Sequence, residues 1–302
     1  MSARSAAPFG RVTNAITVDV EDYFHASAFD RVVPRAAWDD YASRVVPNTH
    51  RLLDLFDEQR VKGTFFVLGW VAKKFPELVR EIGGRGHELA SHGYHHQLVY
   101  MLTPEQFRDD IRRAKGTIED VGGAPVRGYR APSFSIVRSS LWALDVLIEE
   151  GHTYDASIFP IHHDRYGIAD APRAAHVIQR GSGSIVELPG STVRLGGTNY
   201  PIAGGGYFRL FPYAATRWGL ARVHSRDGEP VVLDSHPWEV DPDQPRLEAS
   251  RATLLRHHAG IATTMDKLRQ VTADFSFGRV IDVLEVRAQN AAPSAARWAH
   301  AK

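Results

Sequence analysis

Two histidines, His92 and His96, are separated by three residues in the segment HGYHH. In a helical turn, side chains four positions apart lie on the same face, so both imidazoles could bind one metal ion. Histidine combined with a carboxylate suits zinc or a similar divalent ion, with a fourth position left for water. His95 would point about 100 degrees away from this face and is expected to be solvated or to support the ligands. In a chain with 15 histidines such a pair also arises by chance, so a metal site requires a third ligand elsewhere.

Three carboxylates, Asp19, Glu21 and Asp22, lie within four positions at the end of the run at 15–20. Clustered carboxylates repel one another unless a cation or proton-transfer chemistry accounts for them. One of them could bind the metal, and another could accept a proton from water. A solvated acidic turn is the alternative interpretation. Spacing alone does not decide whether Asp22 or Glu21 is the third ligand.

Three more ionisable residues follow extended runs: Arg130 in YRAPSF, Asp155 in YDASIFP and His236 in VVLDSHPWE. An arginine at such a place would pair with a carboxylate and hold it ionised. Asp155 could orient an imidazole, and His236 is a candidate general acid because the ordinary pKa of histidine is close to neutral. Each residue alone would more often be structural, but five polar segments at five predicted strand ends indicate one site.

The elements that would position these residues alternate along the chain. Strands are predicted at 15–20, 64–69, 87–92, 126–132, 152–159 and 230–236, with helices at 48–59, 76–82, 103–121, 139–150, 213–223, 247–258 and 263–272. This order favours parallel strands joined by crossover helices, whose carboxyl ends lie on the one face where barrel enzymes hold their active sites. A hairpin is predicted in 174–194, and an apolar run, VIDVLEV, ends the pattern. A single barrel-like α/β domain is favoured over a doubly wound open sheet.

The composition excludes several classes of protein. Charge is balanced, with 36 basic and 35 acidic residues, which gives no indication of a nucleic-acid or anionic-membrane partner. Cysteine is absent, so disulfides, thiolate nucleophiles and cysteine-bound zinc are excluded. No apolar stretch reaches the roughly 20 residues that span a bilayer, and the first residues lack the apolar core of a signal peptide. We expect a cytoplasmic protein, a separate export route being the alternative, with one domain at 1–287 and a loose tail at 288–302.

Five segments match, in order, the motifs of a known family: TVDVEDYF, HGYHH, RAPSF, YDASIFP and VVLDSHPWE. The chain resembles the NodB-type polysaccharide deacetylases of carbohydrate esterase family 4, over about 15–240. It is most similar to the subgroup found with exosortase/PEP-CTERM exopolysaccharide loci, whose own C-terminal extension the segment after about 240 resembles. The resemblance implies a distorted (β/α)7-type barrel, here with an inserted hairpin and a helical C-terminal extension. It also implies a divalent metal, usually zinc, with cobalt or nickel as alternatives.

The resemblance implies a role for each catalytic residue. Asp19 would be the base that activates water, and Arg130 would tether it. His236 would protonate the leaving amine, oriented by Asp155. A backbone N–H near Ser133 would help to stabilise the developing oxyanion. The implied reaction is hydrolysis of N-acetyl groups from amino sugars in a polysaccharide or lipid-linked glycan, in exopolysaccharide biosynthesis.

The resemblance also implies that His92 and His96 bind the metal. Many family members have adjacent aspartates, the first a base and the second a ligand, whereas this chain has D-V-E-D. Asp22 is favoured as third ligand because its side chain is short and the turn after the strand can swing it inward, with Glu21 as the alternative.

Sugar contacts are assigned to four residues: Tyr207, Arg209, Trp238 and Glu239. Structural roles fit these four equally well. The tryptophan that often closes the fourth motif is absent, and Phe159 is expected to substitute for it.

Two other functions compete with this interpretation. A ureide or cyclic-amide hydrolase on the same scaffold would act on small substrates, so a closed pocket would favour it and an open groove would favour glycans. A carbohydrate-binding protein with a decayed site is the non-enzymatic alternative. Retention of Asp19, Arg130 and His236 together argues against it, since binding alone needs no acid–base set.

Overall fold

A computed structural model of the chain describes residues 12–290 and 295–296. Its strands are β1 Thr13–Val20, β2 Thr64–Val67, β3 Glu88–Ser91, β4 Gly128–Tyr129, β5 Tyr154–Asp155, β6 His176–Arg180, β7 Gly183–Glu187, β8 Thr192–Leu195, β9 Thr198–Pro201, β10 Val232–Ser235, β11 Ser276–Gly278 and β12 Ala295–Ala296. Its α-helices are α1 Val45–Gln59, α2 Gly69–Lys74, α3 Pro76–Gly84, α4 Pro104–Gly122, α5 Ala143–Glu149, α6 Gly205–Leu210, α7 Tyr213–Asp227, α8 Arg251–His258, α9 Ile261–Asp274 and α10 Val280–Asn290. The tail predicted at 288–302 lies largely outside the described residues.

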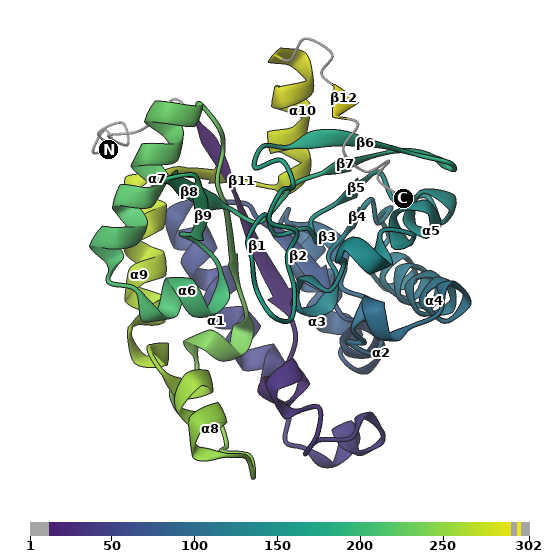
Figure 1. The fold of residues 1–302 in the computed structure, drawn as a ribbon. Helices are drawn as coiled ribbons and strands as arrows, with labels where there is room; N and C mark the ends of the chain where they lie inside the picture. Colours follow the sequence, from purple (N-terminus) through teal and green to yellow (C-terminus); the bar gives the residue numbers. More distant parts are fainter. Residues whose placement is uncertain (1–11, 291–294, 297–302) are drawn as a thin grey trace.

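The main sheet has the strand order β10-β1-β2-β3-β4-β5-β7-β6-β12, and every pair from β10 to β7 is parallel. These parallel strands form a curved wall that the helices surround (Figure 1). Within the described residues the order ends at β10 on one side, so strand pairing does not close the barrel. The parallel strand order and the surrounding helices confirm the predicted distorted (β/α)7-type barrel. The inserted hairpin is confirmed as well, because β6 and β7 pair antiparallel.

Alternation along β1 decides which side chains enter the barrel. Ile16, Val18 and Val20 are fully buried in the core cluster between the sheet and the outer helices. Thr17 and Asp19 face the other way, and both accept a hydrogen bond from an arginine inside the barrel. Alternate side chains of β1 therefore pack against the outer helices, while Asp19 lies in the barrel interior at the carboxyl end of the strand.

The amino end of the barrel is filled by apolar side chains. Phe66 and Ala90 from the strands pack with Val280 and Val283 of α10. The run VIDVLEV is therefore a helix, and β11 just before it pairs with the start of β1. Closure of this end leaves the carboxyl ends of the strands as the face where polar groups gather.

Local sequence signals explain where several helices begin. At the start of α4, Thr103 and Gln106 form a reciprocal cap, with side chain to backbone distances of 2.9 and 3.3 Å. The short helix α2, at Gly69–Lys74, was not predicted. No helix in the described part of the chain combines the length and apolar character that a bilayer crossing needs.

Candidate active site

A pocket of about 230 Å³ lies at the carboxyl ends of the parallel strands. Its polar lining comes from the ends of β1, β3 and β10, and its apolar lining from the loops between them. The lining residues are Asp19, Glu21, Ala26, Ser27, His92, His96, Ala131, Ser133, Phe134, Phe159, Tyr166, Gly204, Gly205, Gly206, Tyr207, Asp234, His236 and Trp238. All five predicted segments thus contribute to one pocket, YDASIFP through Phe159 and not through Asp155.

Glu21, His92 and His96 form a buried cluster in this pocket. Each offers one ligand atom, and these atoms lie within 4.8 Å of one another. Glu21 Oε2 is 2.8 Å from His96 Nε2, yet it has no hydrogen-bond partner among the described residues. A carboxylate oxygen and two imidazole nitrogens that converge on one point form an arrangement that a shared cation satisfies. Two imidazoles and one carboxylate also match the donor set that catalytic zinc accepts.

The spacing of His92 and His96 suggested a helical turn, but the two residues lie in a loop. The segment after β3 is a loop in which Gly93 and His96 adopt left-handed backbone conformations, with φ of +72° and +51°. His92 Nδ1 lies 2.8 Å from the carbonyl oxygen of Arg130, which fixes that nitrogen as the donor and leaves Nε2 for the pocket. Burial lowers the pKa of His92 to about 4, which keeps the ring neutral, as a metal ligand must be.

Electrostatics favour the charged form of Glu21. Burial raises the pKa of Glu21, but attraction to His96, His236 and His92 outweighs burial and lowers it well below its usual range. Glu21 Oε1 accepts a hydrogen bond from Trp238 Nε1 at 3.0 Å. One carboxylate oxygen is thus fixed by the indole, and the other faces the histidines.

Asp22, the ligand favoured from the sequence, points elsewhere, and that expectation is corrected. Its carboxylate accepts backbone hydrogen bonds from Arg44 and Val45, and a side-chain hydrogen bond from Ser43. It also caps the short turn that begins at Tyr23. Because these donors occupy its oxygens, Asp22 is a structural cap that holds residues 43–45. The carboxylate that faces the two histidines is Glu21.

Asp19 stands between the two ends of the pocket. Arg130 Nη1 donates to Asp19 Oδ1 at 2.7 Å and to Thr17 Oγ1 at the same distance. The other oxygen, Oδ2, lies 3.9 Å from His92 Nε2 and 3.8 Å from His236 Nε2. The arginine therefore fixes one oxygen of Asp19, while the other remains directed at the centre of the site.

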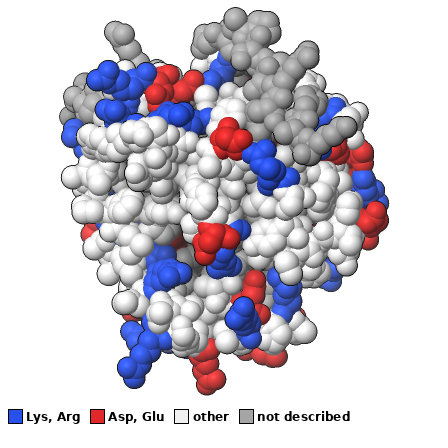
Figure 2. Space-filling model, in the orientation of Figure 1, with Lys and Arg blue, Asp and Glu red and all other residues white. Residues whose placement is uncertain are grey.

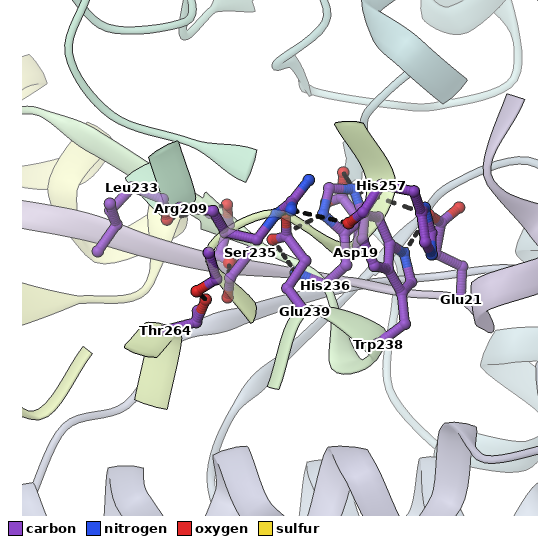
Figure 3. A network of polar contacts seen from close by, with 12 residues as sticks. Asp19, Glu21, Arg209, Leu233, Ser235, His236, Trp238, Glu239, His257 and Thr264 are labelled. Atoms are coloured by element: carbon purple, nitrogen blue, oxygen red, sulfur yellow. Dashed lines mark hydrogen bonds and ion pairs between the residues drawn. The ribbon is translucent and has the colours of Figure 1, made fainter. Parts of the chain in front are cut away.

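His236 is held by Glu239, three residues further along the chain. Its Nδ1 lies 3.1 Å from Glu239 Oε2, and Arg209 Nε donates to Glu239 Oε1 at 2.6 Å. Figure 3 shows this row of side chains, which runs from Arg209 through Glu239 and His236 to Asp19. Burial lowers the pKa of His236, but the carboxylates of Glu239, Glu21 and Asp19 outweigh burial and raise it to about 10.

This row corrects three expectations. Glu239 orients His236, so Asp155 does not. Arg209 is buried and also donates to the carbonyl oxygens of His257 and Ala259, so it supports the site rather than touching a sugar. Glu239 likewise lies behind His236 and outside the pocket lining.

Asp155 belongs to a second, fully buried acidic pair behind the pocket. It accepts a hydrogen bond from Ser157 Oγ, and its carboxyl is paired with that of Glu187. Burial raises the pKa of Asp155 to about 6, and burial together with the Asp155 charge raises that of Glu187 well above its usual range. The pair therefore shares a proton near neutral pH, and Glu187, on β7, was missed because the hairpin seemed remote from the site.

Aromatic rings surround the mouth of the pocket. Phe159 packs against Phe134, Tyr166 and Tyr207, with ring centroids 5.1 to 6.3 Å apart. Of the residues assigned to sugar contacts, Tyr207 and Trp238 line the pocket, and so does Phe159. Neither Phe134 nor Tyr166 was predicted, since single aromatic residues in loops carry no spacing signal.

Ser133 also lies in the pocket lining, in a strained backbone. Ser133 and Phe134 both have φ of +52°, and Ser133 Oγ lies 2.8 Å from Ser27 Oγ across the pocket. Left-handed conformations at two consecutive non-glycine residues are unfavourable, so the surrounding structure must enforce them. Such strain is characteristic of functional loops.

The face of the molecule drawn in Figure 2 carries charges of both signs. On the face shown in Figure 2, basic and acidic side chains are interspersed among uncharged ones, in keeping with a net charge of +1.

Two family models match the chain: polysaccharide deacetylase over residues 35–147 and a domain of unknown function, DUF3473, over residues 156–285. The first range holds His92, His96 and Arg130, and the second holds Asp234 and His236. Asp19 and Glu21 precede both ranges. The pocket is therefore built from both matched regions and from the strand before them.

Curated relatives match over part of their length. A peptidoglycan-N-acetylglucosamine deacetylase of Bacillus cereus is 31% identical over 98 residues, 32% of this chain and 36% of that protein. A peptidoglycan deacetylase of Helicobacter pylori is 33% identical over 116 residues, 38% of this chain and 37% of the relative. A chitooligosaccharide deacetylase of Rhizobium leguminosarum bv. trifolii is 32% identical over 119 residues, which are 38% of this chain and 51% of that protein. The chain thus spans between about a third and a half of these relatives.

One solved structure, described as a candidate polysaccharide deacetylase from Mycobacterium smegmatis, matches 98% of this chain and 97% of its own. The TM-score is 0.60 and the sequence identity 24%, which is evidence for a shared fold. Residues 35–147 thus match the polysaccharide deacetylase family model and residues 156–285 match DUF3473, while the solved structure shares the fold over nearly the whole chain.

Proposed function

We propose that the protein is a metal-dependent hydrolase that removes N-acetyl groups from amino sugars of a glycan. One observation carries the proposal: a single pocket holds a tethered carboxylate, a carboxylate-paired histidine and a cluster of three converging metal donors. The matched deacetylases support amino-sugar amides as the substrate class. A glycan of the exopolysaccharide type remains a prediction from the sequence resemblance.

Glu21, His92 and His96 would hold the metal, most suitably zinc. When bound there, a divalent ion would polarise the amide carbonyl and lower the pKa of water towards about 7. The orphaned Glu21 Oε2 and the neutral His92 ring fit this role, since ligands must be deprotonated.

Asp19 would accept the proton of the attacking water. Its Oδ2 faces the pocket, while the hydrogen bond from Arg130 to Oδ1 restricts rotation of the carboxylate. A base that is fixed in place loses little entropy on reaching the transition state.

His236 would donate a proton to the departing amine. Glu239 accepts the Nδ1 proton and so directs Nε2 at the pocket, 3.8 Å from Asp19. The raised pKa keeps the ring protonated at neutral pH, and a cation bound to Glu21 would lower it towards a value better suited to proton transfer. The backbone N–H of Ser133 would help to stabilise the oxyanion, since those of Ala131, Phe134 and Ser135 already donate within the protein.

The aromatic mouth supports a sugar ligand. Phe134, Phe159, Tyr166, Tyr207 and Trp238 present ring faces and edges beside the polar floor. A pocket of about 230 Å³ that opens to the surface accepts one sugar unit of a longer chain, which favours a glycan over a small ureide. The acid–base set has no use in a protein that only binds carbohydrate.

The test combines metal analysis with acetate release. Purified protein should contain about one zinc, cobalt or nickel ion per chain, and should release acetate from N-acetylglucosamine oligomers. Removal of the ion with a chelator should abolish release, and zinc should restore it. Protein that contains one ion per chain yet acts on allantoin or a cyclic imide, and not on any acetylated oligomer, would favour the small-substrate alternative.

A further inference from the structure

One buried carboxylate in the pocket has no role in the proposed reaction. Asp234 lies on β10, two residues before His236, and pairs in register with Thr17 of β1. Thr17 faces the barrel interior, where it contacts Arg130, so Asp234 faces the interior as well. Its side chain lines the pocket and is 6% exposed.

The Asp234 side chain has no partner. Among the described residues, no hydrogen bond or ion pair reaches its carboxylate, although the other pocket acids Asp19 and Glu21 are both engaged. Burial raises the pKa of Asp234 to about 6, partly opposed by the more distant charges of Arg130 and His236. A largely buried carboxylate without a protein donor is unfavourable unless water in the pocket or a ligand supplies the donor.

The glycine loop at 204–206 shapes one side of this carboxylate. A Cβ at Gly204 would lie 1.9 Å from Asp234 Oδ1, and the backbone φ there is +93°, so glycine is required on both counts. A Cβ at Gly205 would lie 3.6 Å from both Asp234 Oδ2 and His236 Cε1. The acceptor oxygen and the proposed proton donor thus flank one point of the pocket, and the loop leaves room for a ligand atom there.

From this geometry we infer that Asp234 is a specificity-determining residue, which accepts a hydrogen bond from an O–H or N–H group of the amino sugar and disfavours sugars that carry a carboxylate. The inference rests on the proposed function and deepens it. Arg130 donates to Asp19, and a bound metal ion would lie among Glu21, His92 and His96. Neither positive charge is paired directly with Asp234. A neutral or amine-bearing hexosamine supplies the missing donor, whereas an acidic sugar adds repulsion.

The test compares Asp234→Asn and Asp234→Leu with wild type, all loaded with zinc. Asp227→Asn is the matched control, because Asp227 pairs with Arg173 beside a different cavity. Binding of a neutral N-acetylglucosamine tetramer, and of a tetramer that alternates with N-acetylmuramic acid, is measured by calorimetry. Acetate release gives kcat and KM for the same oligomers.

We expect Asp234→Leu to weaken binding of the neutral tetramer by about tenfold to a hundredfold, and Asp234→Asn by less, since the amide oxygen still accepts a hydrogen bond. The preference for the neutral over the acidic tetramer should fall about tenfold or more in both variants, because the charge is gone in each. The loss should appear mainly in KM.

Equal affinities and an unchanged preference in both variants, with Asp227→Asn also unchanged, would overturn the inference. So would a wild-type protein that binds neither tetramer. If zinc-loaded wild type binds the neutral tetramer but releases no acetate, the proposed reaction fails, while the binding data still judge Asp234.

Discussion

The two walls of the pocket differ in how they are completed. On one wall, the ligand atoms of Glu21, His92 and His96 converge on one point, so a bound cation would complete this metal wall. On the other wall, Arg209, Glu239 and His236 form a continuous row of charge-assisted contacts, so this acid wall is organised by the protein alone. Asp19 faces both.

The difference predicts which changes each wall tolerates. A variant that lacks one side chain of the metal wall should bind less metal, because the ion completes that wall. Removal of a group from the acid wall should leave the metal bound and change proton transfer. The following experiments separate the two walls, from the largest expected effect to the smallest.

Loss of the third donor should have the largest effect. Glu21→Ala should lower zinc occupancy below a tenth under dialysis and reduce acetate release about 1000-fold or more, since the ion is expected to supply several kcal/mol of transition-state stabilisation. Asp22→Ala is the matched control. It should keep its zinc but lower the free energy of unfolding by about 1–3 kcal/mol, because the backbone donors of 44 and 45 lose their partner. Zinc loss in Asp22→Ala and retention in Glu21→Ala would reverse the assignment.

Neutralising Asp19, which faces both walls, should have the next largest effect on activity. Asp19→Asn should keep zinc and glycan binding, while kcat falls about 10²- to 10⁴-fold because the amide cannot accept the proton. Elemental analysis and steady-state kinetics measure both quantities. Acetate release at the wild-type rate in a zinc-loaded Asp19→Asn protein would show that Asp19 is not the base.

A change on the acid wall should be smaller and should depend on pH. His236 must be protonated to act, so activity is expected to fall as the pH rises through its pKa. Glu239 raises that pKa, so Glu239→Gln should move the alkaline limb of the kcat profile to lower pH and reduce kcat about 10- to 100-fold, with zinc content unchanged. An alkaline limb at the same pH in wild type and Glu239→Gln would remove Glu239 from this role.

The smallest effect is expected for Asp155, which lies behind both walls and is expected to change the free energy of unfolding. The folded-state pKa of Asp155 is raised above its unfolded value of 3.8 to about 6, so its protonated form stabilises the fold at low pH and this contribution is lost as the pH rises from about 4 to 6. Asp155→Asn mimics the protonated acid. It should therefore raise the free energy of unfolding at pH 7.5 by about 1–2 kcal/mol, and by much less at pH 4.

Urea denaturation at the two pH values measures this difference. The alkaline limb of the activity profile should stay where it is in wild type, because His236 is oriented by Glu239. A limb that shifts in Asp155→Asn would restore the sequence-based view that Asp155 acts on His236.

Sequence patterns predicted the barrel and most of the pocket because both depend on local signals. Apolar runs that end in polar residues located β1, β3 and β10, and parallel order then required their ends to meet. Glu21 could also have been found. Asp22 directly precedes a turn that needs a cap, which leaves Glu21 as the carboxylate free to face the histidines.

The acid wall was harder to predict because its contacts are not local. Arg209 and Glu239 are separated by 30 residues and meet only through tertiary packing. Asp155 and Glu187 are similarly joined by strand pairing between β5 and β7. Neither the partner of a buried carboxylate nor the absence of a partner, as at Asp234, can be read from residue spacing.

The pairing of β1 with both β10 and β11 has a consequence for biosynthesis. Thr17 and Leu233, which touch across this pairing, lie 216 residues apart. While the nascent chain leaves the ribosome, one edge of β1 stays uncovered until more than two thirds of the protein has emerged. An uncovered apolar strand is prone to pair with other chains, so demand for chaperones should fall sharply once β10 is released.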